Sequence, residues 1–305
     1  MPHSPALVSV DWGTSSFRAF LAASDGTALD EVGADRGALG LAKGEHETFL
    51  SAQIGAWKQR YPELPVVMSG MVGARQGWVE APYAPCPAGA AEIAAAALTI
   101  PAAALGPILL APGLSALDSR GAPDVMRGEE TQILGALKAS GGRDGLYVLP
   151  GTHSKWARVA DGRILGFTTF MTGDVFAALK DHTVLGRLMG PAGPNEPAGF
   201  ALGVEAAASL ERPGDLLHAI FMTRTLGLFE RLAPAELAEY LSGLLIGAEI
   251  LAGAGGASSA IVVGSAALTA RYRKAGALIG VELEPAPANC ATLGQIALVE
   301  QLRLR

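Results

Sequence analysis

The stretch Asp11-Trp-Gly-Thr-Ser-Ser-Phe-Arg-Ala-Phe20 and its neighbours predict how the fold begins. Before it, the apolar run Ala6-Leu-Val-Ser-Val10 has the length of a buried strand. After it comes Asp25-Gly26, a pair typical of hairpin turns because both residues tolerate positive φ. The predicted order is therefore strand, Gly-Thr turn, strand, Asp-Gly turn and strand.

The same order recurs near residue 150. The strand-like Leu146-Tyr-Val-Leu149 leads into Pro150-Gly-Thr-His-Ser-Lys-Trp-Ala-Arg-Val159, and Asp161-Gly162 follows. The two Gly-Thr pairs lie 138 positions apart and the two Asp-Gly pairs 136 apart, so the spacing within the two segments is nearly equal. A repeated unit of this kind predicts two lobes, which we expect over 1–140 and 141–305.

Beyond each hairpin the pattern alternates between helix and strand, which predicts an α/β fold with mixed five-stranded sheets flanked by helices. Helices are expected over 46–60, 173–188, 213–231, 235–252 and 291–302 and from 266, and strands over 66–68, 108–111, 260–263 and 278–283. Three prolines in 191–197 predict a surface loop. The last helix is expected either to stay with the C-terminal lobe or to pack back toward the N-terminal lobe.

Composition excludes several classes of protein. Half of the 305 residues are hydrophobic and only 17% are charged, which excludes a disordered chain. The net charge of −6 offers no positive field for a nucleic acid. The two cysteines, Cys86 and Cys290, suit a reducing compartment, and the uncharged run 93–117 is interrupted by prolines. We expect a cytoplasmic protein that binds neither nucleic acid nor membrane.

The two Gly-Thr turns predict phosphate binding. Such a turn presents backbone N–H groups and hydroxyls, the donors that cradle phosphate oxygens, and two turns facing each other would clamp a triphosphate. The donors are Gly13, Thr14 and Ser15 in the first turn and Gly151, Thr152, His153, Ser154 and Lys155 in the second. Asp11 would hold a hydrated Mg²⁺. A single Gly-Thr turn would be explained as an ordinary hairpin turn that Asp11 caps.

Other nucleotide-binding motifs are missing from the sequence. No Gly-Lys dipeptide occurs, which excludes a P-loop. The glycine-rich segment 253–258 precedes a predicted strand, whereas a dinucleotide fingerprint follows one. An oxidoreductase of the Rossmann type is therefore disfavoured.

Longer motifs carry a resemblance to a known family. They are Asp11-Trp-Gly-Thr-Ser15, Gly70-Met-Val-Gly73, Gly77-Trp78, Ala81-Pro-Tyr83, Val125-Met-Arg-Gly-Glu-Glu-Thr-Gln132, Leu149-Pro-Gly-Thr-His-Ser-Lys-Trp156, Met171-Thr-Gly173, Leu241-Ser-Gly-Leu-Leu-Ile-Gly-Ala-Glu249 and Leu268-Thr-Ala-Arg-Tyr272. On these motifs the chain resembles, essentially end to end, the 2-dehydro-3-deoxygalactonokinase family. These are sugar-acid kinases of the actin-like (ribonuclease H-like) ATPase superfamily.

The resemblance implies a fold and a reaction. The fold would have two ribonuclease H-like lobes with a cleft between them, and ATP would phosphorylate the 6-hydroxyl of 2-dehydro-3-deoxy-D-galactonate in galactonate catabolism. The N-terminal lobe would hold most of the sugar-acid pocket, and the C-terminal lobe the adenosine site. Adenosine would lie at Gly264 and Ser265, whose alternative role is to end a strand before a helix.

The resemblance also implies a catalytic base at the first turn of the helix before the second Gly-Thr turn. Glu129 matches that position, although the family pattern has an aspartate one methylene shorter. Glu130 is the alternative base, and both acids would also complement the helix dipole. Asp174 is a second candidate catalytic carboxylate, with helix N-capping as its structural alternative.

The implied substrate carries a carboxylate, so its pocket should contain an arginine capable of bidentate contact. Arg127 is the leading candidate and Arg75 the alternative. Ser69-Gly70-Met71 ends an apolar strand, where ligands gather in open α/β sheets. Trp78 and Tyr83 would form one wall, or else stabilise a loop.

Two rival functions stay open at this point. One is a kinase for another deoxy-keto or hexonic sugar acid, because no motif encodes the stereochemistry of a pocket. The other is a nucleotide-operated protein of the same superfamily that phosphorylates no small molecule. The sequence also leaves a homodimer open.

Overall fold

The computed structural model describes residues 4–191, 198–212 and 214–303. The chain forms two compact units: unit 1 contains Met1–Gly145, Ala157–Phe167 and Ala286–Arg305, and unit 2 contains Leu146–Trp156 and Thr168–Pro285. Unit 1 thus includes the C-terminal helix and a segment beyond the predicted boundary at residue 140. Most of the predicted loop 191–197 lies outside the described residues.

The sheet of unit 1 has the strand order β3-β2-β1-β4-β7-β6. Its strands are β1 Pro5–Trp12, β2 Phe17–Ala23, β3 Ala28–Ala34, β4 Val66–Ser69, β7 Ile108–Leu110 and β6 Leu98–Ile100. The first three form the predicted antiparallel meander, and β4 and β7 run parallel to β1. The prediction of five strands was wrong, because the short strand β6 pairs antiparallel with β7.

The second sheet repeats this arrangement, with the order β12-β11-β10-β13-β14. Its strands are β10 Gly145–Leu149, β11 Ser154–Ala160, β12 Arg163–Phe170, β13 Ser259–Val262 and β14 Glu282–Pro285. Asp161 and Gly162 adopt φ of 52° and 69°, as the predicted Asp-Gly turn requires. A meander followed by two parallel strands is therefore common to both sheets.

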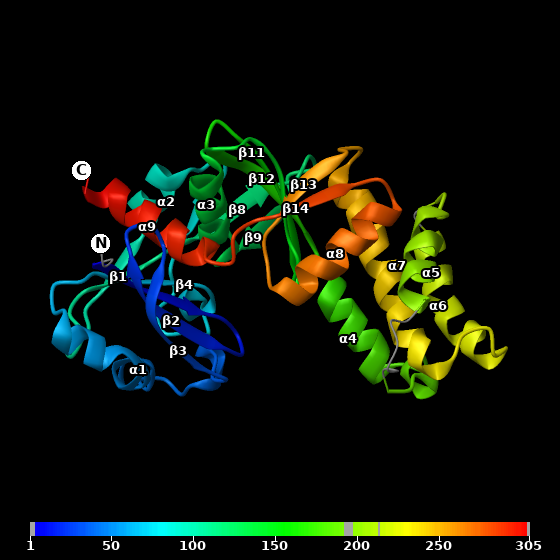
Figure 1. Cartoon of the computed structure of the whole chain (residues 1–305), viewed down its shortest axis with the longest axis horizontal. Helices are drawn as coiled ribbons and strands as arrows, with labels where there is room; N and C mark the ends of the chain where they lie inside the picture. Colours follow the sequence, from blue (N-terminus) through cyan, green and yellow to red (C-terminus); the bar gives the residue numbers. More distant parts are fainter. Residues whose placement is uncertain (1–3, 192–197, 213, 304–305) are drawn as a thin grey trace. The chain divides into compact units, whose positions relative to one another are not determined.

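Helices and a small sheet complete unit 1. The helices are α1 His46–Arg60, α2 Ala90–Ala96, α3 Glu129–Ser140 and α9 Cys290–Arg303, and the three-stranded sheet consists of β5 Tyr83–Pro85, β8 Gly113–Leu117 and β9 Pro123–Met126. In Figure 1, α9 lies beside α3. Gly135 of α3 touches the backbone of Cys290 and Gly294 of α9 touches that of Thr131, so the two helices approach closely.

Unit 2 is mostly helical (Figure 1). Its helices are α4 Thr172–His182, α5 Gly199–Ala208, α6 Asp215–Leu228, α7 Pro234–Ala254 and α8 Ala266–Leu278. The predicted helix 173–188 ends at His182, and a short 3₁₀ turn, Gly186–Leu188, follows. The strand predicted over 278–283 is present but begins later, because α8 extends to Leu278 and β14 spans Glu282–Pro285.

Helix α7 is the core helix of unit 2. By length and composition alone it would be able to cross a membrane, but 67% of its most apolar stretch is buried inside the protein. Its apolar character therefore reflects its packing against α5 on one side and α8 on another.

Candidate active site

The first Gly-Thr turn joins β1 to β2 and closes through the main chain. The N–H of Gly13 donates to the carbonyl of Ser16 at 2.9 Å. Thr14 and Ser15 are exposed at the tip of the turn. Gly37 packs directly behind it, so that a Cβ at this position would overlap the Thr14 carbonyl. The turn is therefore packed from behind, and Thr14 and Ser15 are left exposed at its tip.

Asp11 lies at the end of β1, and its side chain is 16% exposed. Its Oδ2 accepts a hydrogen bond from Nη2 of Arg18 at 2.7 Å. Among the described residues, no three His, Cys, Asp or Glu side chains gather around a potential metal site. This donor set would fit a hydrated Mg²⁺ held mainly by nucleotide phosphates, with Asp11 as a carboxylate ligand and Arg18 as a competing cation.

Three segments that are distant in sequence meet at the carboxyl ends of β1 and β4. Asp11 pairs with Ser69 in the parallel register. The next residue, Gly70, has φ 100°, and a Cβ there would stand 2.7 Å from the Trp12 carbonyl. Gly128, with φ 103°, lies against Gly70: a Cβ at Gly128 would stand 3.1 Å from the Gly70 Cα. The start of α3 is thereby placed beside the first Gly-Thr turn.

Glu129 and Glu130 begin α3 but have different surroundings. Glu129 is half-buried and accepts a hydrogen bond from the N–H of Arg127 at 2.9 Å. Glu130 is fully buried; it accepts from the N–H of Gly128 at 2.6 Å and from the hydroxyl of Thr131 at 2.9 Å. Burial, with a smaller contribution from the Glu129 charge, raises the pKa of Glu130 to about 7. Of the two carboxylates, only that of Glu129 is accessible to a ligand.

Arg127 is a buried cation with unused donors. The residue is 9% exposed, and its Nη2 donates to the carbonyl of Ala81 at 2.8 Å. Its Nε and Nη1 are buried without a hydrogen-bond partner within the part of the chain that the structure describes. The guanidinium lies 4.3 Å from the centroid of the Tyr83 ring. A buried guanidinium with two unpaired nitrogens is costly unless a ligand completes it.

The other predicted substrate residues differ in their exposure and contacts. Trp78 is half-buried and stacks on His46, with ring centroids 6.1 Å apart and planes at 12°, so it belongs to an aromatic wall of unit 1. Met71 is half-buried, whereas Arg75 is exposed. Ser69 is buried, and its hydroxyl accepts a hydrogen bond from Gln295. Contact of these residues with a sugar acid stays a prediction.

The second Gly-Thr turn, in unit 2, closes differently. The N–H of Gly151 donates to the hydroxyl oxygen of Ser154 at 3.3 Å, so a side chain closes this turn. Thr152 and His153 are exposed at its tip. Gly173 packs behind it, and a Cβ there would stand 2.7 Å from both the Gly151 carbonyl oxygen and the Thr152 Cα.

Asp174 is joined to this turn at two points. Its N–H donates to the Thr152 carbonyl at 3.1 Å, and its Oδ2 lies 2.7 Å from Nε2 of His153. The N-cap of α4 is Met171, and no side chain caps that helix end. The interpretation of Asp174 as an N-cap was therefore wrong: it lies within the first turn of α4 and pairs with His153.

Two predicted phosphate ligands point inward. Ser154 is fully buried, and Lys155 is 5% exposed with its Nζ donating to the Thr169 hydroxyl at 2.8 Å. Phosphate contact by Ser154 stays a prediction for its backbone N–H, since its hydroxyl closes the turn. Contact by Lys155 stays a prediction as well.

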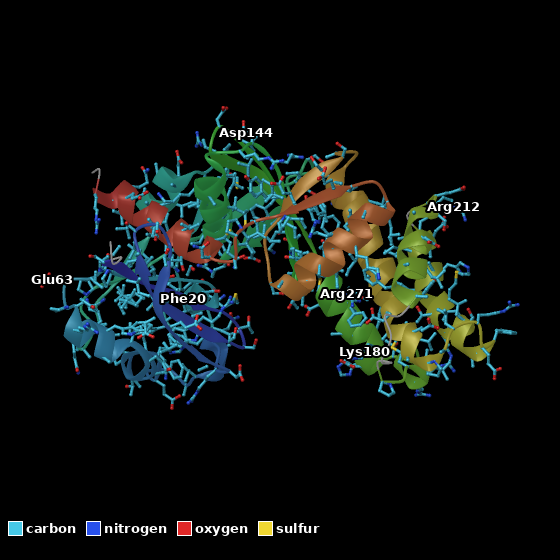
Figure 2. All side chains as sticks on the ribbon, in the orientation of Figure 1. Phe20, Glu63, Asp144, Lys180, Arg212 and Arg271 are labelled. Carbon is cyan, nitrogen blue, oxygen red and sulfur yellow. The ribbon has the colours of Figure 1, made fainter. Side chains whose placement is uncertain are left out.

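A cavity of about 470 Å³ opens beside the second turn, within unit 2. Gly151, Gly173 and Tyr272 line it together with residues of α4, α7 and α8. Figure 2 labels two of its basic residues, Lys180 on α4 and Arg271 on α8. The remaining lining is largely apolar. A cavity of this size and character suits a nucleoside base.

The sequence matches the 2-keto-3-deoxy-galactonokinase family over residues 11–298. The chain belongs to this family. A relative from Rhizobium meliloti (strain 1021), named as a probable 2-dehydro-3-deoxygalactonokinase, is 42% identical over 88% of this chain and 87% of its own length. The 2-dehydro-3-deoxygalactonokinase of Escherichia coli (strain K12) is 31% identical over 93% of this chain and 94% of its own.

A crystal structure shares the fold of the whole chain. It is that of a Sinorhizobium meliloti protein proposed to be a 2-dehydro-3-deoxygalactonokinase, and it superposes with a TM-score of 0.85 at 37% identity over 98% of both chains. Family membership makes the protein a sugar-acid kinase. The predicted α/β class with two ribonuclease H-like sheets is confirmed.

The predicted adenosine residues of this kinase do not line the cavity. Ser265 is the N-cap of α8, and its Oγ accepts a hydrogen bond from the N–H of Leu268 at 3.4 Å. Gly264 lies against Pro150. The structural alternative, a strand end before a helix, therefore describes Ser265, and its contact with adenosine stays a prediction.

Sequence reasoning missed two polar residues in the core of the kinase. Gln295 on α9 is fully buried, and its Nε2 donates to the Val10 carbonyl and to the Ser69 hydroxyl, each at 2.9 Å. Glu249 on α7 is 3% exposed and lies below the second turn. The sequence did contain a signal for Gln295 and Glu249: each is a polar residue at a position of its helix where the apolar pattern predicts burial.

Proposed function

We propose that the protein transfers the γ-phosphoryl group of ATP to the 6-hydroxyl of 2-dehydro-3-deoxy-D-galactonate, a step of galactonate catabolism. Unit 1 would bind the sugar acid and carry the proton transfer. Unit 2 would bind adenosine in its cavity, and the exposed groups of each Gly-Thr turn would bind phosphate. We also place the kinase in the cytoplasm, since Cys86 and Cys290 are both free thiols.

The proposal rests on the unpaired hydrogen-bond donors of the buried Arg127 side chain. Its Nε and Nη1 are buried and unpaired, and its backbone N–H donates to Glu129. A carboxylate of the substrate would accept from one of these unpaired nitrogens and would offset the buried charge. One short segment thus offers a site for the acid end of the substrate and a carboxylate for its reacting end.

Glu129 would act as the general base. A primary hydroxyl becomes a better nucleophile when a carboxylate within hydrogen-bond reach accepts its proton during the attack on phosphorus. Glu129 is accessible, whereas Glu130 is buried and occupied by hydrogen bonds within its own helix turn. Asp174 would instead orient the imidazole of His153 at the second turn, beside the phosphate oxygens that this turn would bind.

Asp11 would hold Mg²⁺ together with the phosphates of the nucleotide. When bound, this ion supplies neutralisation of the charge that develops on the phosphoryl oxygens. The Arg18 guanidinium, paired with Asp11 in this structure, would exchange part of that contact for a phosphate oxygen. Thr14 and Ser15 would complete the phosphate contacts of the first turn.

A coupled assay of ADP release with a panel of phosphoryl acceptors tests the proposal. The panel contains 2-dehydro-3-deoxy-D-galactonate, its C4 epimer, a hexonic acid and a neutral hexose. We expect the named substrate to give the largest kcat/KM. A larger value for another acid would identify a different sugar-acid kinase. ADP release that no acceptor stimulates would instead indicate a nucleotide-operated protein that is not a kinase.

A further inference from the structure

A buried carboxylate lies below the second Gly-Thr turn. Glu249, near the end of α7, is 3% exposed. Its Oε1 accepts a hydrogen bond from Nε1 of Trp156 at 2.9 Å, and its Oε2 accepts one from the Tyr272 hydroxyl at 2.6 Å. The side chains of Thr172 and Ser154 lie close enough to contribute to lowering its pKa by hydrogen bonding. Groups from β11, α4 and α8 therefore converge on one carboxylate.

The site is shaped to hold these partners. Gly253 follows Glu249 by one helical turn, and a Cβ there would overlap the indole of Trp156. The absence of a side chain thus lets the indole lie against α7 and donate to Glu249. Burial raises the pKa of Glu249, and the four hydrogen bonds oppose this effect. Burial, together with the nearby Glu249, raises the pKa of Tyr272, so its hydroxyl stays a donor.

These partners lead directly to the phosphate-binding turn. The Ser154 hydroxyl that closes the turn at Gly151 lies 3.0 Å from the Tyr272 hydroxyl. Thr172 precedes Gly173, the residue that packs behind the turn. The closing hydroxyl of the turn is therefore linked to Glu249 through Tyr272, and Thr172, next to the packed glycine, lies near the same carboxylate within unit 2.

We propose that Glu249 is a positioning residue for nucleotide phosphate: through Ser154, Tyr272 and Thr172 it holds the second Gly-Thr turn in the conformation that binds phosphate oxygens. This inference rests on the proposed function of that turn. It assigns Glu249 no contact with ATP, because the carboxylate is buried and occupied by protein donors.

The test compares the binding of ATP and adenosine to Glu249→Gln by isothermal titration calorimetry in the presence of Mg²⁺. Glutamine keeps the shape of the side chain but brings N–H groups toward donors, which disturbs the hydrogen bonds that reach Ser154. We expect the Kd for ATP to rise about 10-fold, as for the loss of one charge-assisted hydrogen bond, and the Kd for adenosine to stay within about twofold. Because no sugar acid is present, the result does not depend on which acceptor the enzyme phosphorylates.

A double-mutant cycle and a stability control complete the test. If Glu249 acts through Ser154, the effects of Glu249→Gln and Ser154→Ala on ATP binding will not add. Leu244→Ala, on the face of α7 that packs into a separate core cluster, will lower the Tm and leave the ratio of the two Kd values unchanged. An equal loss of ATP and adenosine binding in Glu249→Gln, no loss of either, or additive effects in the cycle would overturn the inference. Wild-type enzyme that fails to bind ATP would overturn the proposed function instead.

Discussion

The two Gly-Thr turns share one sequence pattern but are stabilised by different hydrogen bonds. In unit 1 the turn closes from the Gly13 N–H to the Ser16 carbonyl, a bond that any residue at position 16 would provide. In unit 2 the Gly151 N–H donates to the side chain of Ser154, which depends in turn on a buried hydrogen-bond network. Repetition of a motif therefore does not imply repetition of its supports.

Their surroundings also differ. The first turn lies beside Asp11, Gly70 and the start of α3, where Glu129 and Arg127 offer a base and an anion site. The second turn lies beside a largely apolar cavity. Substitutions near the first turn should therefore change chemistry and sugar-acid binding, and substitutions near the second should change nucleotide binding.

The largest expected effect is that of Glu129→Gln. Removal of a general base should lower kcat by about two to four orders of magnitude while the Kd for ATP stays within about twofold. Steady-state kinetics and calorimetry measure the two quantities. Near-normal turnover would move the role of general base to Glu130 or Asp174. If it moved to Asp174, the assignment of proton transfer to unit 1 would be wrong.

Arg127→Lys should come next. Lysine keeps the charge but loses the planar donor pair, so KM for the sugar acid should rise about 10- to 100-fold with KM for ATP unchanged. Arg120→Lys is the matched control, because the Arg120 side chain is 85% exposed and lies outside the predicted site, so its substitution should change neither constant. An unchanged KM for the sugar acid in Arg127→Lys would exclude the assignment of the substrate carboxylate to this residue.

A pair of serine substitutions sharpens the comparison of the turns. Ser154→Ala removes the acceptor that closes the second turn, so KM for ATP should rise about 10-fold. Ser16→Ala keeps the backbone carbonyl that closes the first turn, so its KM for ATP should change less than about twofold. Equal effects of the two substitutions in steady-state assays would show that both turns depend on side chains alike.

A separate effect is expected on the pH dependence of stability. In the folded protein the pKa of Glu130 rises from its ordinary value of 4.5 to about 7. The protonated form therefore favours folding: the stabilisation is complete below about pH 4.5 and is lost as the pH rises through about 7. Tm measured between pH 5 and pH 8 should fall more steeply for the wild type than for Glu130→Gln. Parallel curves would contradict the raised pKa.

Local sequence signals predicted much of this fold. The Asp-Gly turns and the helices α1 and α7 follow from turn chemistry and periodicity, which depend on neighbouring residues alone. The strand predicted over Leu278–Leu283 was placed too early, because local pattern locates the end of a helix, here Leu278, less precisely than it locates the helix itself. Strand β6 escaped notice in a stretch rich in alanine and proline.

The site was predicted less completely. Arg127, Glu129 and the exposed tips of both turns were found because motifs mark them. The inward direction of Ser154 and Lys155 could not be predicted from composition, since it depends on where β11 begins. The partners of Glu249 and Gln295 come from distant segments, and only the folded chain brings them together.

The most direct measurement is the proton-coupled ³¹P spectrum of the product formed from ATP and 2-dehydro-3-deoxy-D-galactonate. Transfer to the 6-hydroxyl predicts a phosphate monoester whose phosphorus signal is split by the two protons of one CH₂ group. A signal from inorganic phosphate alone, or one split by a single CH proton, would contradict the reaction proposed for this site.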